Sequence, residues 1–105
     1  MHTTHLRLIT IVCESVLEER LTQALRRLGA SGWTASDARG DGARGVRMSP
    51  TPGENVRIES LVEDRVAEQV LDHLATEYFP HYAMVAWTTD AAVVRGEKYK
   101  EGGKR

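Results

Sequence analysis

The residues best suited to chemistry lie in one glycine- and arginine-rich stretch near the middle of the chain. Its members are Arg39, Gly40, Gly42, Arg44, Gly45 and Arg47. Glycine lets a backbone turn sharply and approach a ligand closely, and successive backbone N–H groups in such a loop can form an anion-binding nest. Guanidinium groups add planar pairs of donors that suit phosphate or carboxylate. The stretch predicts an anion site; the alternative is a hairpin tip whose arginines are only solvated.

The spacing of the glycines matches a dinucleotide-binding fingerprint over residues 40–45. That fingerprint requires a helix directly after the glycines, because the helix N-terminus holds the pyrophosphate. Here Pro50, Pro52 and Gly53 follow instead. We therefore reject a Rossmann fold and expect a long functional loop over about residues 39–54.

The remaining reactive side chains do not combine into a catalytic or metal-binding set. The histidines, His2, His5, His73 and His81, show no pair at ligand spacing with a cysteine or carboxylate partner. Cys13 is the single cysteine, so an intrachain disulfide is excluded, and we expect it to be a small buried hydrophobe. Without a recognisable nucleophile and base, the protein is predicted not to be an enzyme.

Length and charge limit the class of protein. The 105 residues favour a single domain over residues 1–105, and 41% hydrophobic residues suffice for a packed core. A formal net charge of -1 argues against nucleic acid as a partner. The sequence has no apolar run of bilayer length and no signal-peptide pattern, so we expect a cytoplasmic protein.

Hydrophobic periodicity predicts a first strand over residues 6–13 and a helix over residues 16–28. Ser15 and Glu18 fit a capping box at the start of that helix, and Gly29 is placed to end it in a left-handed turn. In the strand, Ile9, Ile11 and Cys13 alternate with a second apolar set, so both faces need cover. We expect Ile9 and Ile11 on the open face of the sheet, against a neighbouring subunit.

The second half of the chain repeats this order of elements. Strands are predicted over residues 33–38 and 55–62, paired as an antiparallel hairpin with the long loop at its tip. A helix over residues 64–78, a strand over 82–89 and a short fifth strand over 91–95 follow, with a charged tail over about residues 96–105. The order βαββαβ predicts an α+β, ferredoxin-like sandwich.

With this order of elements, four segments resemble the PII-like signalling proteins. They cover residues 28–34, 40–47, 55–59 and 78–83. The resemblance extends over residues 6–99 and is greatest to the branch around the bicarbonate-transporter regulator SbtB and the carboxysome-associated PII-like proteins. It implies a homotrimer that binds adenine nucleotides (AMP, ADP, ATP or cyclic AMP) in clefts between subunits. The loop over residues 39–54 then corresponds to the family's T-loop, whose order changes with the ligand.

The resemblance also implies which residues contact the nucleotide. Thr34 matches a strand position near the adenine, and Tyr82, Ala83 and Met84 match a strand that lines the base from the neighbouring subunit. The T-loop side of the site is expected to comprise Asp37, Gly40, Asp41, Gly42, Ala43, Arg44 and Arg47. Bicarbonate is an expected second ligand, and a bicarbonate transporter or a carboxysome component is an expected partner.

The chain departs from the family in ways that affect its function. Asp41 stands where some relatives have lysine, and the loop lacks the tyrosine that nitrogen-sensing members present for modification. Sensing of 2-oxoglutarate with magnesium–ATP is therefore not expected. Two alternatives remain open: a CutA-like trimeric metal-binding protein using His73 or His81, and a weak nucleotide hydrolase dependent on Arg44 or Asp41.

Overall fold

A computed structural model describes residues 1–40 and 53–99 of the chain. Within these two ranges lie four strands, two α-helices and two short 3-10 helices. They are β1 (Thr4–Glu14), η1 (Ser15–Leu17), α1 (Glu18–Leu28), β2 (Thr34–Ala38), β3 (Asn55–Val62), α2 (Asp64–Glu77), β4 (Met84–Val93) and η2 (Gly96–Tyr99). This is the predicted βαββαβ order.

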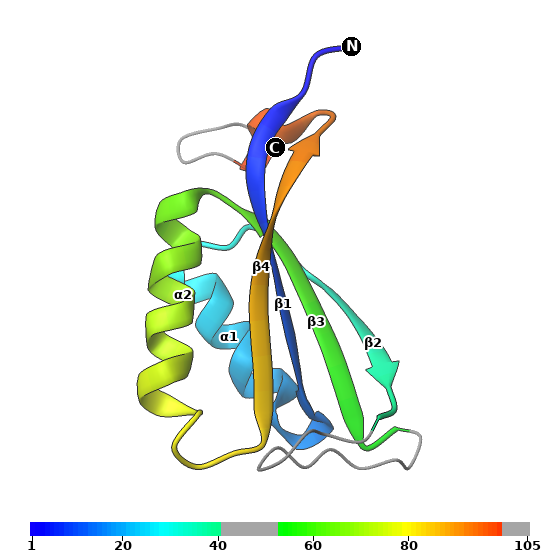
Figure 1. The fold of residues 1–105 in the computed structure, drawn as a ribbon, viewed down its shortest axis with the longest axis vertical. Helices are drawn as coiled ribbons and strands as arrows, with labels where there is room; N and C mark the ends of the chain where they lie inside the picture. Colours follow the sequence, from blue (N-terminus) through cyan, green and yellow to red (C-terminus); the bar gives the residue numbers. More distant parts are fainter. Residues whose placement is uncertain (41–52, 100–105) are drawn as a thin grey trace.

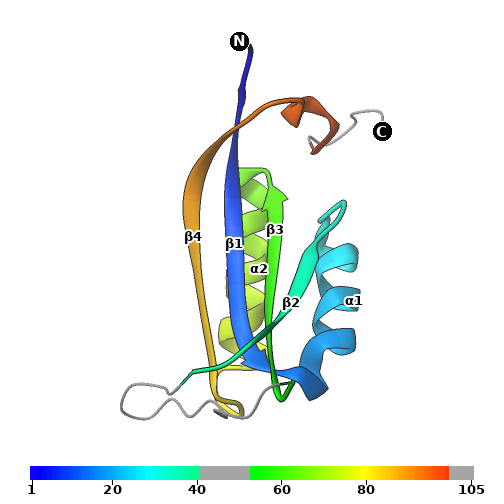
Figure 2. The same ribbon diagram turned by 90° about the vertical axis from the view of Figure 1, so that its right-hand side faces the viewer.

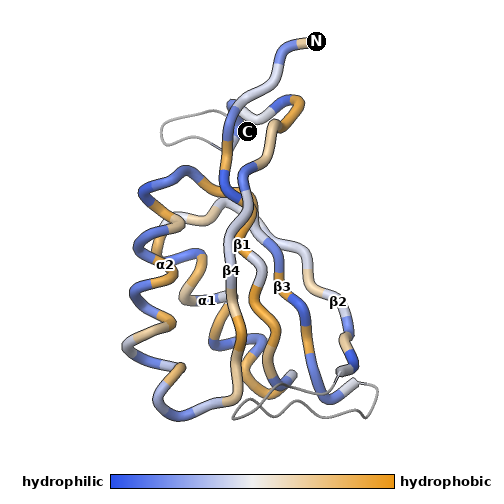
Figure 3. Tube along the Cα trace, in the orientation of Figure 1, coloured by the Kyte–Doolittle hydropathy of each residue, from blue (hydrophilic) through white to orange (hydrophobic). Residues whose placement is uncertain are grey.

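The strands form one antiparallel sheet in the order β2-β3-β1-β4, and both α-helices cover the same face of it (Figures 1 and 2). The hairpin prediction is confirmed, because β2 pairs with β3 from Thr34–Glu59 to Ala38–Asn55. Along α2, hydrophobic and hydrophilic residues alternate with the helical turn (Figure 3), and its buried side chains, such as Val66 and Val70, face the sheet.

The faces of β1 are the reverse of the sequence prediction. Ile9, Ile11 and Cys13 pack in the core among residues of both helices, so they do not lie on the open face. Leu8 and Val12 alternate with them and therefore point to the open side. Because both sets are apolar, the sequence pattern offered no means of choosing between the two faces.

The start of the first helix also differs from the prediction. Ser15 begins a 3-10 turn, and α1 begins at Glu18 with Leu17 as its N-cap and no side-chain cap. The Ser15 hydroxyl instead donates to the carbonyl oxygen of Gly53 at 2.9 Å, and its N–H donates to that of Glu54 at 2.8 Å. The capping-box prediction is wrong because these tertiary bonds, at the end of the loop before β3, use the serine.

The end of the first helix agrees with the sequence prediction, whereas the bounds of the last strand differ from it. Gly29 ends α1 with φ 117°, a left-handed conformation that glycine adopts without steric cost. The last strand begins at Met84 and continues to Val93, so the separate fifth strand is wrong. Tyr82 and Ala83 lie in the connection before β4 and not in a strand.

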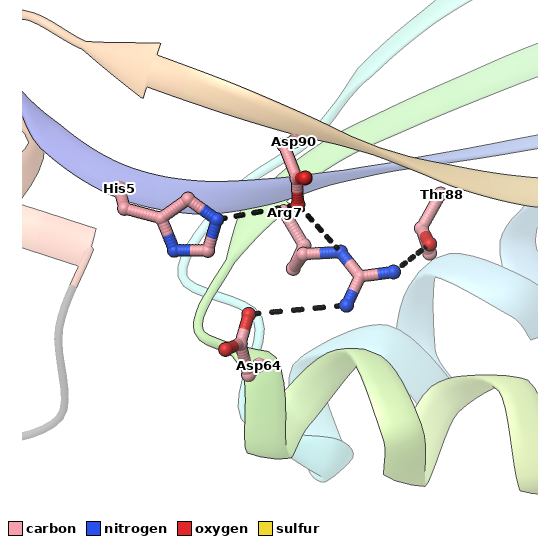
Figure 4. A network of polar contacts seen from close by, with 5 residues as sticks. All are labelled: His5, Arg7, Asp64, Thr88 and Asp90. Atoms are coloured by element: carbon pink, nitrogen blue, oxygen red, sulfur yellow. Dashed lines mark hydrogen bonds and ion pairs between the residues drawn. The ribbon is translucent and has the colours of Figure 1, made fainter.

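A polar network joins three elements at one end of the sheet (Figure 4). The Arg7 guanidinium on β1 donates to the hydroxyl of Thr88 and lies 3.6 Å from Asp90, both on β4. It also lies 3.9 Å from Asp64 at the start of α2, and His5 contacts Asp90 at 3.2 Å. The network links β1 to the helix layer beyond the end of the apolar core.

The open face of the sheet presents large apolar side chains. Val85 and Trp87 on β4 are each 40% exposed, and Leu8, Val12 and Leu61 lie on the same face by strand register. The guanidinium of Arg57 lies 5.9 Å from the centre of the Trp87 ring. This face therefore combines an apolar surface with a cation–π pair.

Candidate nucleotide-binding cavity

A cavity of about 350 Å³ opens beside the first residues of β2. Strands β1, β2 and β3, the connection before β2, and η2 all contribute to its lining. The lining residues are Leu8, Gly32, Trp33, Thr34, Glu59, Ser60, Leu61 and Tyr99. Leu8, Thr34, Glu59 and Leu61 share the open face by register, so the cavity lies on the side of the sheet that the helices leave uncovered.

The cavity exists because two neighbouring chain segments diverge there. Pairing between β2 and β3 ends at Thr34–Glu59. The residues beyond that pair border the cavity: Gly32 and Trp33 on the β2 side, and Ser60 and Leu61 on the β3 side. Backbone at the end of a ladder offers donors and acceptors that the sheet itself does not use. Such an edge suits the hydrogen-bonding edge of a planar base.

A hydrogen bond and a cation–π contact hold the backbone segments on the two sides of the cavity in place. Ser60, only 3% exposed, donates its hydroxyl to the carbonyl oxygen of Gly32 at 2.6 Å. The Arg26 guanidinium, in the last turn of α1, lies 4.8 Å from the centre of the Trp33 ring, which packs against the core. The residues leading into β2 are therefore held from both the sheet and the helix layer.

The charge of the lining limits what the cavity can bind. Leu8 and Leu61 are apolar, Thr34 is polar, and Glu59 pairs with Arg57 at 3.6 Å. No lysine or arginine is among the described residues that line the cavity. The space therefore suits an uncharged planar group better than a phosphate, and the phosphates of a nucleotide would require cations from elsewhere.

The predicted site residues are dispersed in a single chain. Thr34 lines the cavity, Asp37 lies further along β2 opposite Val56, and Gly40 follows the end of that strand. The predicted residues that lie outside the described parts of the chain are Asp41, Gly42, Ala43, Arg44 and Arg47.

The residues expected to line the base from a neighbouring subunit lie away from this chain's own cavity. The Tyr82 hydroxyl accepts a bond from Arg20 at 3.1 Å, and Ala83 follows it in the connection before β4. Met84 pairs with Cys13 and is buried in the core. None of these three residues lines the cavity of its own chain.

Sequence reasoning missed most of the cavity. The sequence pattern predicts Leu8 and Leu61 only as strand residues, and it places Glu59 on the polar face of a strand with alternating hydrophobicity. The available signal was the apolar character of the second face of β1. For Tyr99 the sequence held no signal, because its position depends on contacts with the other end of the chain.

The described residues give no support to metal or nucleophile chemistry. Within residues 1–40 and 53–99, no three His, Cys, Asp or Glu side chains are grouped to hold a metal ion. His73 instead lies edge-on to Tyr78, with ring centres 5.7 Å apart. Burial raises the pKa of Cys13 to about 12, which keeps the thiol protonated and unreactive. No helix in these ranges is long and apolar enough to cross a bilayer.

Comparison with known proteins finds similarity over most of the length of the chain. Residues 6–98 match the family model "Nitrogen regulatory protein P-II". A PII-like signaling protein of Thermus thermophilus is 46% identical, with a TM-score of 0.82 over 94% of this chain and 99% of that one.

Two structures of CPII from Thiomonas intermedia share the fold at lower identity. One, with ADP, AMP and acetate, is 21% identical, with a TM-score of 0.84 over 95% of this chain and 99% of that one. The other, with ADP, AMP and bicarbonate, is 22% identical, with a TM-score of 0.75 over 89% and 97%.

Proposed function

The chain belongs to the nitrogen regulatory protein P-II family, and from this premise we propose that its cavity beside β2 receives the base of an adenine nucleotide. The supporting observation is the cavity itself: apolar walls at Leu8 and Leu61, the end of a strand ladder along one side, and no basic residue among its described lining. This combination fits a neutral planar base, which needs apolar cover and hydrogen bonds along one edge.

The phosphates are proposed to bind the glycine- and arginine-rich start of the T-loop, which continues from β2 past Gly40. Arg44 and Arg47 would supply the cations that the cavity lacks. Under this proposal Arg44→Ala weakens nucleotide binding without lowering the melting temperature. Unchanged affinity in that variant would contradict the assignment of the phosphates.

The assembly is proposed to be a homotrimer that buries the open face of the sheet. Val85 and Trp87, each 40% exposed, form an apolar area of the kind that subunit interfaces cover. Because the cavity opens on the same side of the sheet, a neighbouring subunit would close part of the nucleotide site. Tyr82, Ala83 and Met84 remain proposed contacts from that neighbour.

The signal is proposed to pass through the T-loop. Nucleotide contacts that differ between loop conformations would shift their populations and thereby select a partner. Because one CPII structure contains bicarbonate with ADP and AMP, we propose bicarbonate as a second ligand and a bicarbonate transporter or carboxysome component as the partner. No catalytic step is proposed.

Calorimetric titration tests this function. Purified protein is titrated with AMP, ADP, ATP and cyclic AMP, each with and without bicarbonate. Saturable binding near one nucleotide per chain is expected, and a change in affinity on adding bicarbonate would identify it as a second ligand. Absence of binding by all four nucleotides would overturn the proposal, whereas turnover of ADP or ATP by the same sample, lost in Asp41→Asn, would favour the hydrolase alternative.

A further inference from the structure

The last described segment of the chain forms one wall of the cavity. After β4 the backbone passes across β1 to η2, which lies above the start of β2 (Figure 2). Tyr99, the last described residue, lines the cavity. Leu6 shares the face of Leu8 yet is 0% exposed, which is consistent with η2 packing against β1 at this end of the open face.

Three features fix the path of this segment. Arg95 has φ 64°, so the chain turns through a conformation that is uncommon for a residue other than glycine. Gly96 is buried so closely that a Cβ there would lie 2.7 Å from the Cβ of Thr4 and 3.2 Å from that of Val93. The Thr4 hydroxyl donates to the Glu97 carboxylate at 3.4 Å. The start of β1 therefore fixes the position from which Tyr99 reaches the cavity.

We propose that Tyr99 stacks on the base in the cavity and retains it, and that the packing of Gly96 on Thr4 positions Tyr99 for this contact. This inference rests on the proposed function. The Lys98 ammonium lies 5.3 Å from the centre of the Tyr99 ring, and Tyr99 also lines the cavity. Tyr99 and Trp33 are the aromatic residues of the described lining, and the Trp33 ring is occupied by Arg26 and the core.

The two parts of the site then have different tasks. The diverging backbones of β2 and β3 recognise the edge of the base, whereas Tyr99 contacts its face, and such stacking tolerates any base. Tyr99 therefore sets how tightly a nucleotide is held rather than which base is chosen. Thr4 and Gly96 are positioning residues, because they act only through Tyr99.

The test is calorimetric titration with ADP of the full chain and four variants. Tyr99→Phe keeps the ring and should bind within about twofold of the unchanged protein, whereas Tyr99→Leu should weaken binding about tenfold or more. Gly96→Ala should weaken binding to a similar extent, because the added methyl group displaces the segment. The double variant should bind no more weakly than Tyr99→Leu alone, since both changes remove one contact.

Val94→Ala is the matched control, because its side chain is 52% exposed and lies in the same segment outside the cavity. It should bind ADP as the unchanged protein does. Melting curves of Gly96→Ala identify any general loss of folding.

Each other outcome overturns a defined part of the account. If Tyr99→Leu binds normally while the cavity-filling Thr34→Phe does not, the stacking inference is wrong and the proposed function stands. If Gly96→Ala still weakens binding in the Tyr99→Leu background, the positioning role is wrong. If the unchanged protein binds no adenine nucleotide, the inference falls together with the proposed function.

Discussion

The guanidinium of Arg26 lies 4.8 Å from the centre of the Trp33 ring, and this contact joins the end of α1 to the edge of the cavity. Gly29 makes the left-handed turn between them, so the two residues approach across a tight connection. Trp33 is thereby held between the core and a cation. The helix layer, which does not reach the open face of the sheet, still influences the site there.

Removing this contact should destabilise the protein slightly. We expect Arg26→Ala to lower the free energy of unfolding by about 0.5–1 kcal/mol, the usual size of an exposed cation–π pair. Arg27→Ala is the control, because it removes the same charge from the same last turn of α1, and the aromatic contact of Arg26 stays intact. Urea denaturation of both variants measures the difference, and equal losses would mean that the Trp33 contact contributes nothing.

The bond from Ser60 to Gly32 should matter for both stability and binding. Ser60→Ala leaves the Gly32 carbonyl without the buried donor seen at 2.6 Å, which we expect to cost about 1–2 kcal/mol of unfolding free energy. Because Gly32 borders the cavity, ADP affinity should fall as well. Ser36→Ala, at an exposed position of β2, should change neither quantity. A Ser60→Ala variant whose unfolding free energy and ADP affinity are both unchanged would contradict this role.

The Cys13 thiol should make stability depend on alkaline pH. Burial raises its pKa from 9.0 to about 12, so the folded protein keeps the proton that the unfolded chain loses. The resulting stabilisation is fully present below pH 9 and decreases as pH rises from 9 towards 12. Burial raises the pKa of Tyr78 too, so the measurement is the difference between the unchanged protein and Cys13→Ala. Identical pH profiles of the two would contradict the assignment.

The open face should control assembly. Trp87→Lys places a charge in the proposed interface. We therefore expect chromatography with light scattering to show trimers for the unchanged protein and monomers for this variant, with circular dichroism unaltered. Val16→Lys is the control, because Val16 is 84% exposed and lies outside the sheet. A trimeric Trp87→Lys variant would exclude this face as the subunit interface.

The elements of this fold could be predicted from local sequence patterns, but their tertiary roles could not. The alternation of apolar and polar residues predicts β3, and helical periodicity predicts α2 from Asp64, because both patterns depend on residues that are close in sequence. The burial of Ile9 rather than Leu8 depends on which face the helices cover, and both faces of β1 are apolar. Ser15 bonds to Gly53 across 38 positions, which a local capping pattern cannot reveal.

The candidate site was still less accessible from sequence. The family resemblance predicts Thr34 as a nucleotide contact; Thr34 lines the cavity, and its contact with a nucleotide stays a prediction. Tyr99 was not identified, because its place depends on the contact between Gly96 and Thr4, at opposite ends of the chain. A site formed by distant segments leaves no spacing pattern for its residues.

The most direct test of the central claim is ADP titration of a cavity-filling variant against a matched control. Thr34→Phe places a ring in the cavity of about 350 Å³, and Thr76→Phe makes the same change at an exposed position of α2. If the cavity holds the base, Thr34→Phe abolishes saturable binding, whereas Thr76→Phe binds as the unchanged protein does. Equal ADP affinity in the two folded variants would contradict the placement of the nucleotide in this cavity.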